Sequence, residues 1–120
     1  MAESPNPISS NIIRQIIKKS LFTERQIEII LNQLKLHKTR FVISKGAYFR
    51  QVKQSRDKLI GLYYSLVLLK GLGVLVPEDI DVISKLSDQV SVIKDSDVFP
   101  EKEEEIMFVI GELVNRACRV

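Results

Sequence analysis

A single long helix is predicted by residues 44–73, SKGAYFRQVKQSRDKLIGLYYSLVLLKGLG. Ser44 suits the N-cap position, because its hydroxyl can accept a hydrogen bond from a free backbone N–H of the first turn. No proline interrupts the segment, and Gly61 alone costs only about 1 kcal/mol relative to alanine. Gly71 and Gly73 end the helix, because glycine adopts the left-handed conformation without steric cost. We therefore expect one helix over about 45–70.

Apolar residues recur at helical spacing on both sides of this segment, which predicts an all-α fold in a single compact domain. Thr23 and Gln26 form a capping box that starts a helix near Glu24. Pro77 fits the first turn of another helix, where its missing N–H costs nothing. The five expected helices span about 9–20, 24–35, 45–70, 77–93 and 100–118, after a disordered N-terminal lead over 1–8.

The composition excludes several classes of protein. The chain has 120 residues, of which 45% are hydrophobic, which suffices for one core but not for a two-domain enzyme. One cysteine and one histidine provide neither an internal disulfide nor a Cys/His zinc site. No phosphate-binding glycine loop or nucleophile elbow occurs, so we expect a non-enzymatic protein without a cofactor or metal. The polar start of the chain, with Pro5 and Pro7, is unlike a secretory signal and favours a cytoplasmic location.

Charge is distributed unevenly along the chain. Residues 1–60 contain twelve Lys and Arg against four Asp and Glu, a net charge of +8, whereas residues 61–120 contain six against eleven, a net charge of −5. We therefore divide the helical domain into a basic half, 9–60, which suits a polyanion, and an acidic half, 61–120, which is expected to serve packing and dimerisation. Association between the unlike halves of two copies is an alternative explanation.

The basic part of the long helix favours contact with the DNA major groove. At about 100° per residue, Tyr48, Phe49, Val52, Ser55 and Leu59 share one side, and basic and amide side chains occupy the other. Arg and Gln can each make two hydrogen bonds to base edges, and Lys neutralises phosphates. A solvated charged face is the alternative interpretation. The predicted base contacts are Arg50, Gln51 and Gln54, and the small Ala47 lets the start of the helix approach the groove closely. The predicted phosphate contacts are Lys38, Arg40, Lys45, Lys53 and Lys58.

Two short strings resemble parts of helix-turn-helix transcription factors. Residues 21–30, LFTERQIEII, resemble the first helix of such factors of the sigma-factor region-four and LuxR-like kind. Residues 43–47, ISKGA, resemble the entry to their recognition helix. The resemblance covers about residues 21–60 and implies a trihelical DNA-binding unit in which Ala47, Arg50, Gln51 and Gln54 face the bases. The basic charge, the regulatory size and the abundance of Ile and Lys further suggest an archaeal protein.

Residues 59–76 are the most apolar window, with thirteen apolar side chains in eighteen positions. Its lysine, serine and three glycines disfavour a membrane span. A helix that is apolar on every side must be buried on every side, so either the other four helices enclose it or part of it meets a second copy. A homodimer fits DNA binding, because two-fold operators place two recognition helices one turn apart. Core packing is expected for the aromatic residues, with stacking on unpaired bases as the alternative: Tyr48, Phe49, Tyr63 and Tyr64.

These features together predict a non-enzymatic protein that binds double-stranded DNA, in transcriptional regulation or chromosome architecture. Two other classes stay open. A helical protein–protein interaction module would use the basic face to bind an acidic partner, and an RNA-binding protein would prefer structured or single-stranded RNA to duplex DNA. Because counterion release makes nucleic-acid affinity strongly dependent on salt, a salt series separates nucleic-acid partners from protein partners.

Overall fold

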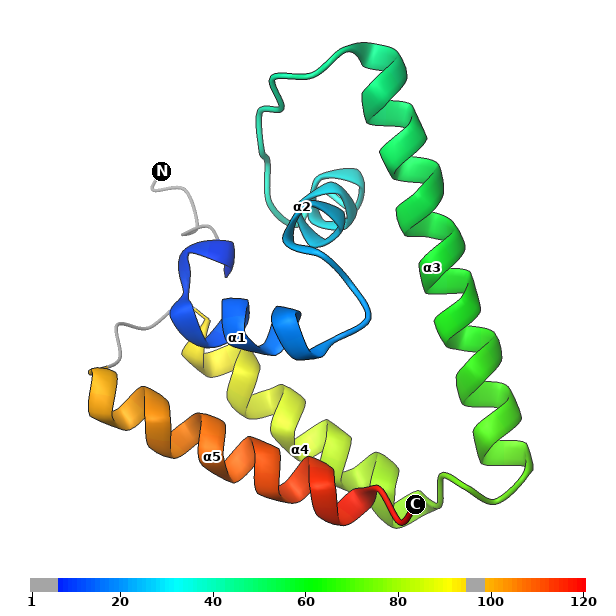
Figure 1. Ribbon diagram of the computed structural model, residues 1–120, viewed down its shortest axis with the longest axis vertical. Coiled ribbons are helices and arrows are strands. Elements are labelled where there is room, and N and C mark those ends of the chain that lie inside the picture. Colours follow the sequence, from blue (N-terminus) through cyan, green and yellow to red (C-terminus); the bar gives the residue numbers. More distant parts are fainter. Residues whose placement is uncertain (1–6, 95–98) are drawn as a thin grey trace.

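The computed structural model describes residues 7–94 and 99–120, and every regular element within them is helical. A short 3-10 helix, η1 (Pro7–Ser9), precedes five α-helices (Figure 1). These are α1 (Asn11–Lys19), α2 (Glu24–Gln33), α3 (Lys45–Gly71), α4 (Pro77–Ile93) and α5 (Pro100–Ala117). The predicted all-α fold of five helices is confirmed, and the ends of the last three helices agree with the prediction to within one residue.

Local capping signals explain this agreement. The Thr23 hydroxyl accepts a hydrogen bond from Gln26 N at 3.2 Å, and Gln26 Oε1 accepts one from Thr23 N at 3.0 Å, so the predicted capping box is present. Ser44 Oγ accepts from Ala47 N at 3.1 Å and starts α3. Beyond the last turn of α3, Gly73 has a φ of 80°, the left-handed conformation that glycine adopts freely.

The N-terminal prediction needs two corrections. Of the disordered lead expected over 1–8, residues 1–6 lie outside the described residues, but Pro7 and Ile8 belong to η1. Ile8 is only 4% exposed, and its carbonyl accepts a hydrogen bond from Arg14 Nε at 2.9 Å, which ties η1 to α1. The first α-helix begins at Asn11 rather than at 9, because the Ser10 side chain accepts from Ile13 N as the N-cap.

The helices form two packing groups. In the first, α2 packs across the first half of α3, where Ile29 and Ser55 are each 1% exposed. In the second, α1 packs against η1 and α5, and α4 packs against α5. Figure 1 shows α2 nearly end-on beside α3, whereas α1, α4 and α5 lie together on the other side of the molecule. The residues 72–76 connect α3 to the second group.

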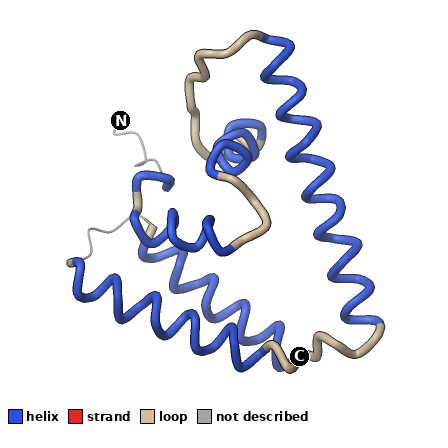
Figure 2. Tube along the Cα trace, in the orientation of Figure 1, coloured by secondary structure: helices blue, strands red, loops and turns tan. Residues whose placement is uncertain are grey.

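The second half of α3 lies outside both groups. Figure 2 shows α3 as one continuous helix whose C-terminal half stands apart from α1 and α2. Tyr63, Tyr64 and Val67 are 67%, 74% and 72% exposed, so of the two alternatives for residues 59–76, enclosure by the other four helices is wrong. The reason is that α2 covers only the first half of α3, while α4 and α5 pack on each other. Core packing was also wrong for Phe49, which is exposed.

Candidate nucleic-acid interface

Exposed basic side chains recur along the chain from the end of α2 to the middle of α3. Residues 29–56 contain seven Lys and Arg and no Asp or Glu, and all seven basic side chains are exposed. Three of them lie in the connection 34–44 and four lie in the first half of α3, so they belong to two consecutive segments of the fold. We call this region the basic surface, and its members are Lys35, Lys38, Arg40, Lys45, Arg50, Lys53 and Arg56.

The outward side of α3 carries the side chains predicted to contact bases. Arg50 and Gln54, one helical turn apart, are exposed and make no hydrogen bond or ion pair within the described chain. Lys53 is also exposed, and its only ion pair there is with Asp57 at 3.6 Å, a solvent-exposed i,i+4 pair. Gln51 and Ala47 are half-buried toward α2. Two groups capable of base-edge hydrogen bonds are therefore free for a ligand.

Lys58 lies on the inward side of α3, contrary to the predicted division of the helix. Its Nζ donates a hydrogen bond to Gln26 Oε1 at 2.9 Å and lies 5.8 Å from the centre of the Phe22 ring. Phe49, predicted to face inward, is 54% exposed, with the Lys45 ammonium 6.0 Å from its ring centre. The inward stripe is narrower than expected because a single helix, α2, covers this part of α3.

A polar and aromatic network holds the connection between α2 and α3. Tyr48 Oη accepts a hydrogen bond from Asn32 Nδ2 at 2.7 Å and donates one to Gln33 Oε1 at 2.9 Å. Asn32 Oδ1 accepts from Thr39 N at 3.3 Å, and the Phe41 ring lies 5.4 Å from that of Tyr48. These contacts fix the chain between Lys38 and Arg40. The sequence alone does not predict the network, because its hydrogen-bond partners are seven to sixteen residues apart and no bonded pair lies within one helix.

The first turn of α3 adds backbone donors to the basic surface. The Ser44 side chain satisfies Ala47 N, while the N–H groups of Lys45 and Gly46 have no acceptor in the described chain. Gly46 is exposed, and a β-carbon placed there would meet nothing within 4 Å. Unpaired N–H groups at a helix N-terminus favour an anion such as phosphate.

The arrangement of α1, α2 and α3 bears on the resemblance to helix-turn-helix factors. An eleven-residue connection without helix, 34–44, separates α2 from α3. The helix α1 packs on η1 and α5 rather than closing a three-helix unit, and it is linked to α2 by an ion pair between Arg14 Nε and Glu24 Oε1 at 3.9 Å. The resemblance therefore stays a prediction that rests on the two quoted strings.

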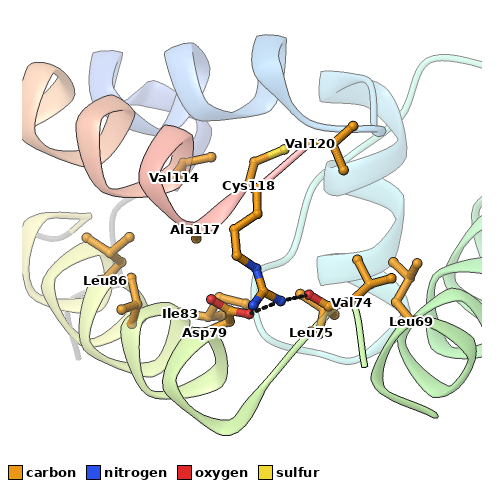
Figure 3. Close-up of a pocket in the computed structure, with 12 residues that line it drawn as sticks. Leu69, Val74, Leu75, Asp79, Ile83, Leu86, Val114, Ala117, Cys118 and Val120 are labelled. Carbon is orange, nitrogen blue, oxygen red and sulfur yellow. Dashed lines mark hydrogen bonds and ion pairs between the residues drawn. The ribbon is translucent and has the colours of Figure 1, made fainter. Parts of the chain in front are cut away.

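An apolar cavity lies away from the basic surface. It has a volume of about 520 Å³ and is lined mainly by apolar side chains of α4, the C-terminal segment and the end of α3 (Figure 3). Asp79, 8% exposed, borders it, accepts a hydrogen bond from Val76 N at 2.9 Å and pairs with Arg119 at 3.7 Å. Arg119 also donates to the Val74 carbonyl. These polar groups are satisfied by the protein itself, so they fasten the C-terminus rather than bind a ligand.

Comparisons with known proteins give no match: no family model, curated protein or solved structure is similar to this chain. Across the described ranges, no group of three His, Cys, Asp or Glu residues is placed to hold a metal ion. No described helix is long and apolar enough to cross a bilayer. The evidence for a function therefore comes from the charge and the exposure of the described side chains.

Proposed function

We propose that this chain is a non-enzymatic protein that binds double-stranded DNA through the basic surface, in transcriptional regulation or chromosome architecture. The observation that carries the proposal is the run of seven exposed basic side chains over residues 29–56 without one acid. No described ion pair joins these side chains to the acidic helices α4 and α5, so their charge is available to a polyanion.

The proposed contacts to DNA are of two kinds, to phosphates and to base edges. Lys38, Arg40, Lys45 and Lys53 neutralise phosphates, and they position the protein without reading sequence. Arg50 and Gln54 reach base edges in the major groove, where Arg recognises guanine and Gln recognises adenine. The other three predicted contacts have less reach: Ala47 and Gln51 are half-buried, and Lys58 is already bonded to Gln26.

A salt series on a fluorescently labelled duplex tests the proposal. Four phosphate contacts predict a slope of log affinity against log salt of about −3.6, which is a loss of about 150-fold between about 50 and 200 mM salt. The triple variant Lys38→Gln, Arg40→Gln, Lys45→Gln should reduce the slope by about 2.7. Its control carries the same charge change on the acidic half: Lys85→Gln, Lys102→Gln, Arg116→Gln. A slope near zero for the unmodified protein would reject DNA binding and favour an acidic protein partner.

Single-stranded nucleic acid is the second candidate, and the exposed Phe49 favours it. An aromatic ring that is 54% exposed within a basic surface can stack on an unpaired base. Tighter binding to single-stranded RNA or DNA than to duplex, with a large loss for Phe49→Ala, would replace duplex DNA as the ligand.

A homodimer is the proposed assembly. Two copies of the basic surface would engage two half-sites of a two-fold operator, which raises both affinity and specificity over one copy.

A further inference from the structure

The second half of α3 exposes an unusual amount of apolar surface. Tyr63, Tyr64, Val67, Leu68 and Leu72 are between 58% and 74% exposed. Within residues 59–72 the only charged side chain is Lys70. We call the exposed apolar residues of this segment the distal face: Ile60, Tyr63, Tyr64, Leu66, Val67, Leu68 and Leu72.

The distal face extends around most of the helix. At about 100° per residue, its members cover about 240° of the circumference. A helix that packs against one layer of a globular protein needs an apolar stripe only about 100° wide. A partner that lies flat on one side therefore cannot bury the distal face, whereas a partner that wraps around the helix can.

The chain exposes more surface than an average monomer of its size, by an amount that a stable dimer interface could bury. The chain exposes 9357 Å², whereas an average folded monomer of its mass, 13.7 kDa, exposes about 6,600 Å². Its radius of gyration, 16.1 Å, exceeds the value of about 13.6 Å for an average domain of this length. One subunit contributes about 1,000–2,500 Å² or more to an obligate homodimer interface, so the excess area of about 2,800 Å² is sufficient for one.

We propose that the occupant of the distal face is a second copy of this chain, in an intertwined two-fold dimer. The distal halves of the two α3 helices cross each other, and each inserts beside the α4–α5 group of the other copy. The apolar cavity of about 520 Å³, which includes Leu69 and Leu75 next to the end of α3, then accepts side chains of the partner. This arrangement covers several sides of the helix at once, as its all-round apolar character requires.

The dimer geometry is compatible with binding to two DNA half-sites. This comparison, unlike the interface itself, rests on the proposed function. If the helices cross near Tyr64, Arg50 lies fourteen residues, or about 21 Å, from the crossing point. In an antiparallel pair the two Arg50 residues are then at most about 42 Å apart along the axes, and closer when the axes are inclined. That range includes the 34–36 Å or so of one DNA turn between half-sites.

Sedimentation equilibrium of the full chain tests the interface. We expect the unmodified protein to have twice the mass of 13.7 kDa at micromolar concentration. Tyr64→Glu and Val67→Glu, which place a charge in the interface, should each weaken the dimer by about 100-fold or more. Leu21→Glu is the matched control, because Leu21 is equally exposed, at 71%, but lies in the connection before α2. Circular dichroism checks that each variant keeps its helices.

Cross-linking decides the question if a glutamate variant fails to fold. In a Cys118→Ser background, Val67→Cys should give a covalent dimer with a short bismaleimide, and Leu21→Cys should not. A monomeric unmodified protein, a dimer unaffected by both glutamate variants, or equal cross-linking at both positions would overturn the interface. So would a monomer that binds phosphatidylcholine vesicles through Tyr64. A dimer that does not bind DNA would refute only the proposed function, and DNA binding by a monomer would refute only the interface.

Discussion

Ser55 provides a test of the contact that positions the basic surface. It is 1% exposed at the centre of the α2–α3 contact, and its Oγ has no hydrogen-bond partner. A buried hydroxyl without a partner costs about 1–3 kcal/mol. Alanine also has a higher helix propensity than serine, by about 0.5 kcal/mol. Since the substitution removes one atom and leaves only a small void, Ser55→Ala should raise the free energy of unfolding by about 1–2 kcal/mol.

Urea unfolding followed by circular dichroism measures this change, and a thermal scan should show a Tm about 4–8 °C higher. Ser65→Ala is the matched control on the same helix, because Ser65 is exposed and its Oγ donates to the Gly61 carbonyl at 2.8 Å. It should change the free energy of unfolding by less than about 0.5 kcal/mol. DNA affinity should stay unchanged in both variants. A destabilised Ser55→Ala protein would refute the reasoning, because it would mean that the hydroxyl is satisfied in solution.

Arg50→Ala should cost about 1–3 kcal/mol of binding free energy on a preferred duplex site, whereas Lys53→Ala should weaken binding to all sequences similarly. Anisotropy titrations on two duplexes measure both effects. An equal loss on every sequence for Arg50→Ala would reject base reading. Gly73→Ala should lower the free energy of unfolding by about 1–2 kcal/mol, because φ there is 80°, while Gly71→Ala, at the last position of α3, should raise it by up to about 1 kcal/mol in urea unfolding. Asp79→Ala, which removes the acceptor for Val76 N, should cost about 1 kcal/mol in the same assay, and no loss would show that this cap contributes nothing.

Most of the secondary structure could be predicted because its signals are local. The Thr23–Gln26 capping box, the Ser44 N-cap and Pro77 each act within one turn of the residues they organise. Ser10 is a signal of the same kind, and its position before Asn11 would have corrected the first helix boundary. Such interactions do not depend on tertiary contacts, so they can be predicted from the local sequence.

The side that each helix buries could not be predicted as well, because it depends on contacts between distant residues. Lys58 meets Gln26 and Phe22 only because α2 crosses α3 at that level, and Tyr48 finds Asn32 across a folded connection. A helical wheel groups side chains by direction but does not show how many neighbours surround the helix. The wheel therefore predicted the exposure of Arg50 and Gln54, while it gave the wrong environment for Phe49.

The length of α3 has a mechanical consequence. An unbroken α-helix of 27 residues is about 40 Å long and resists bending, so it behaves as a lever arm between its two ends. A rotation of about 10° at the C-terminal end would displace the N-terminal end by about 7 Å, the distance between neighbouring phosphates along a DNA strand. Small rearrangements near the C-terminal end of α3 are thus magnified at its N-terminal half, where Arg50 and Gln54 are exposed.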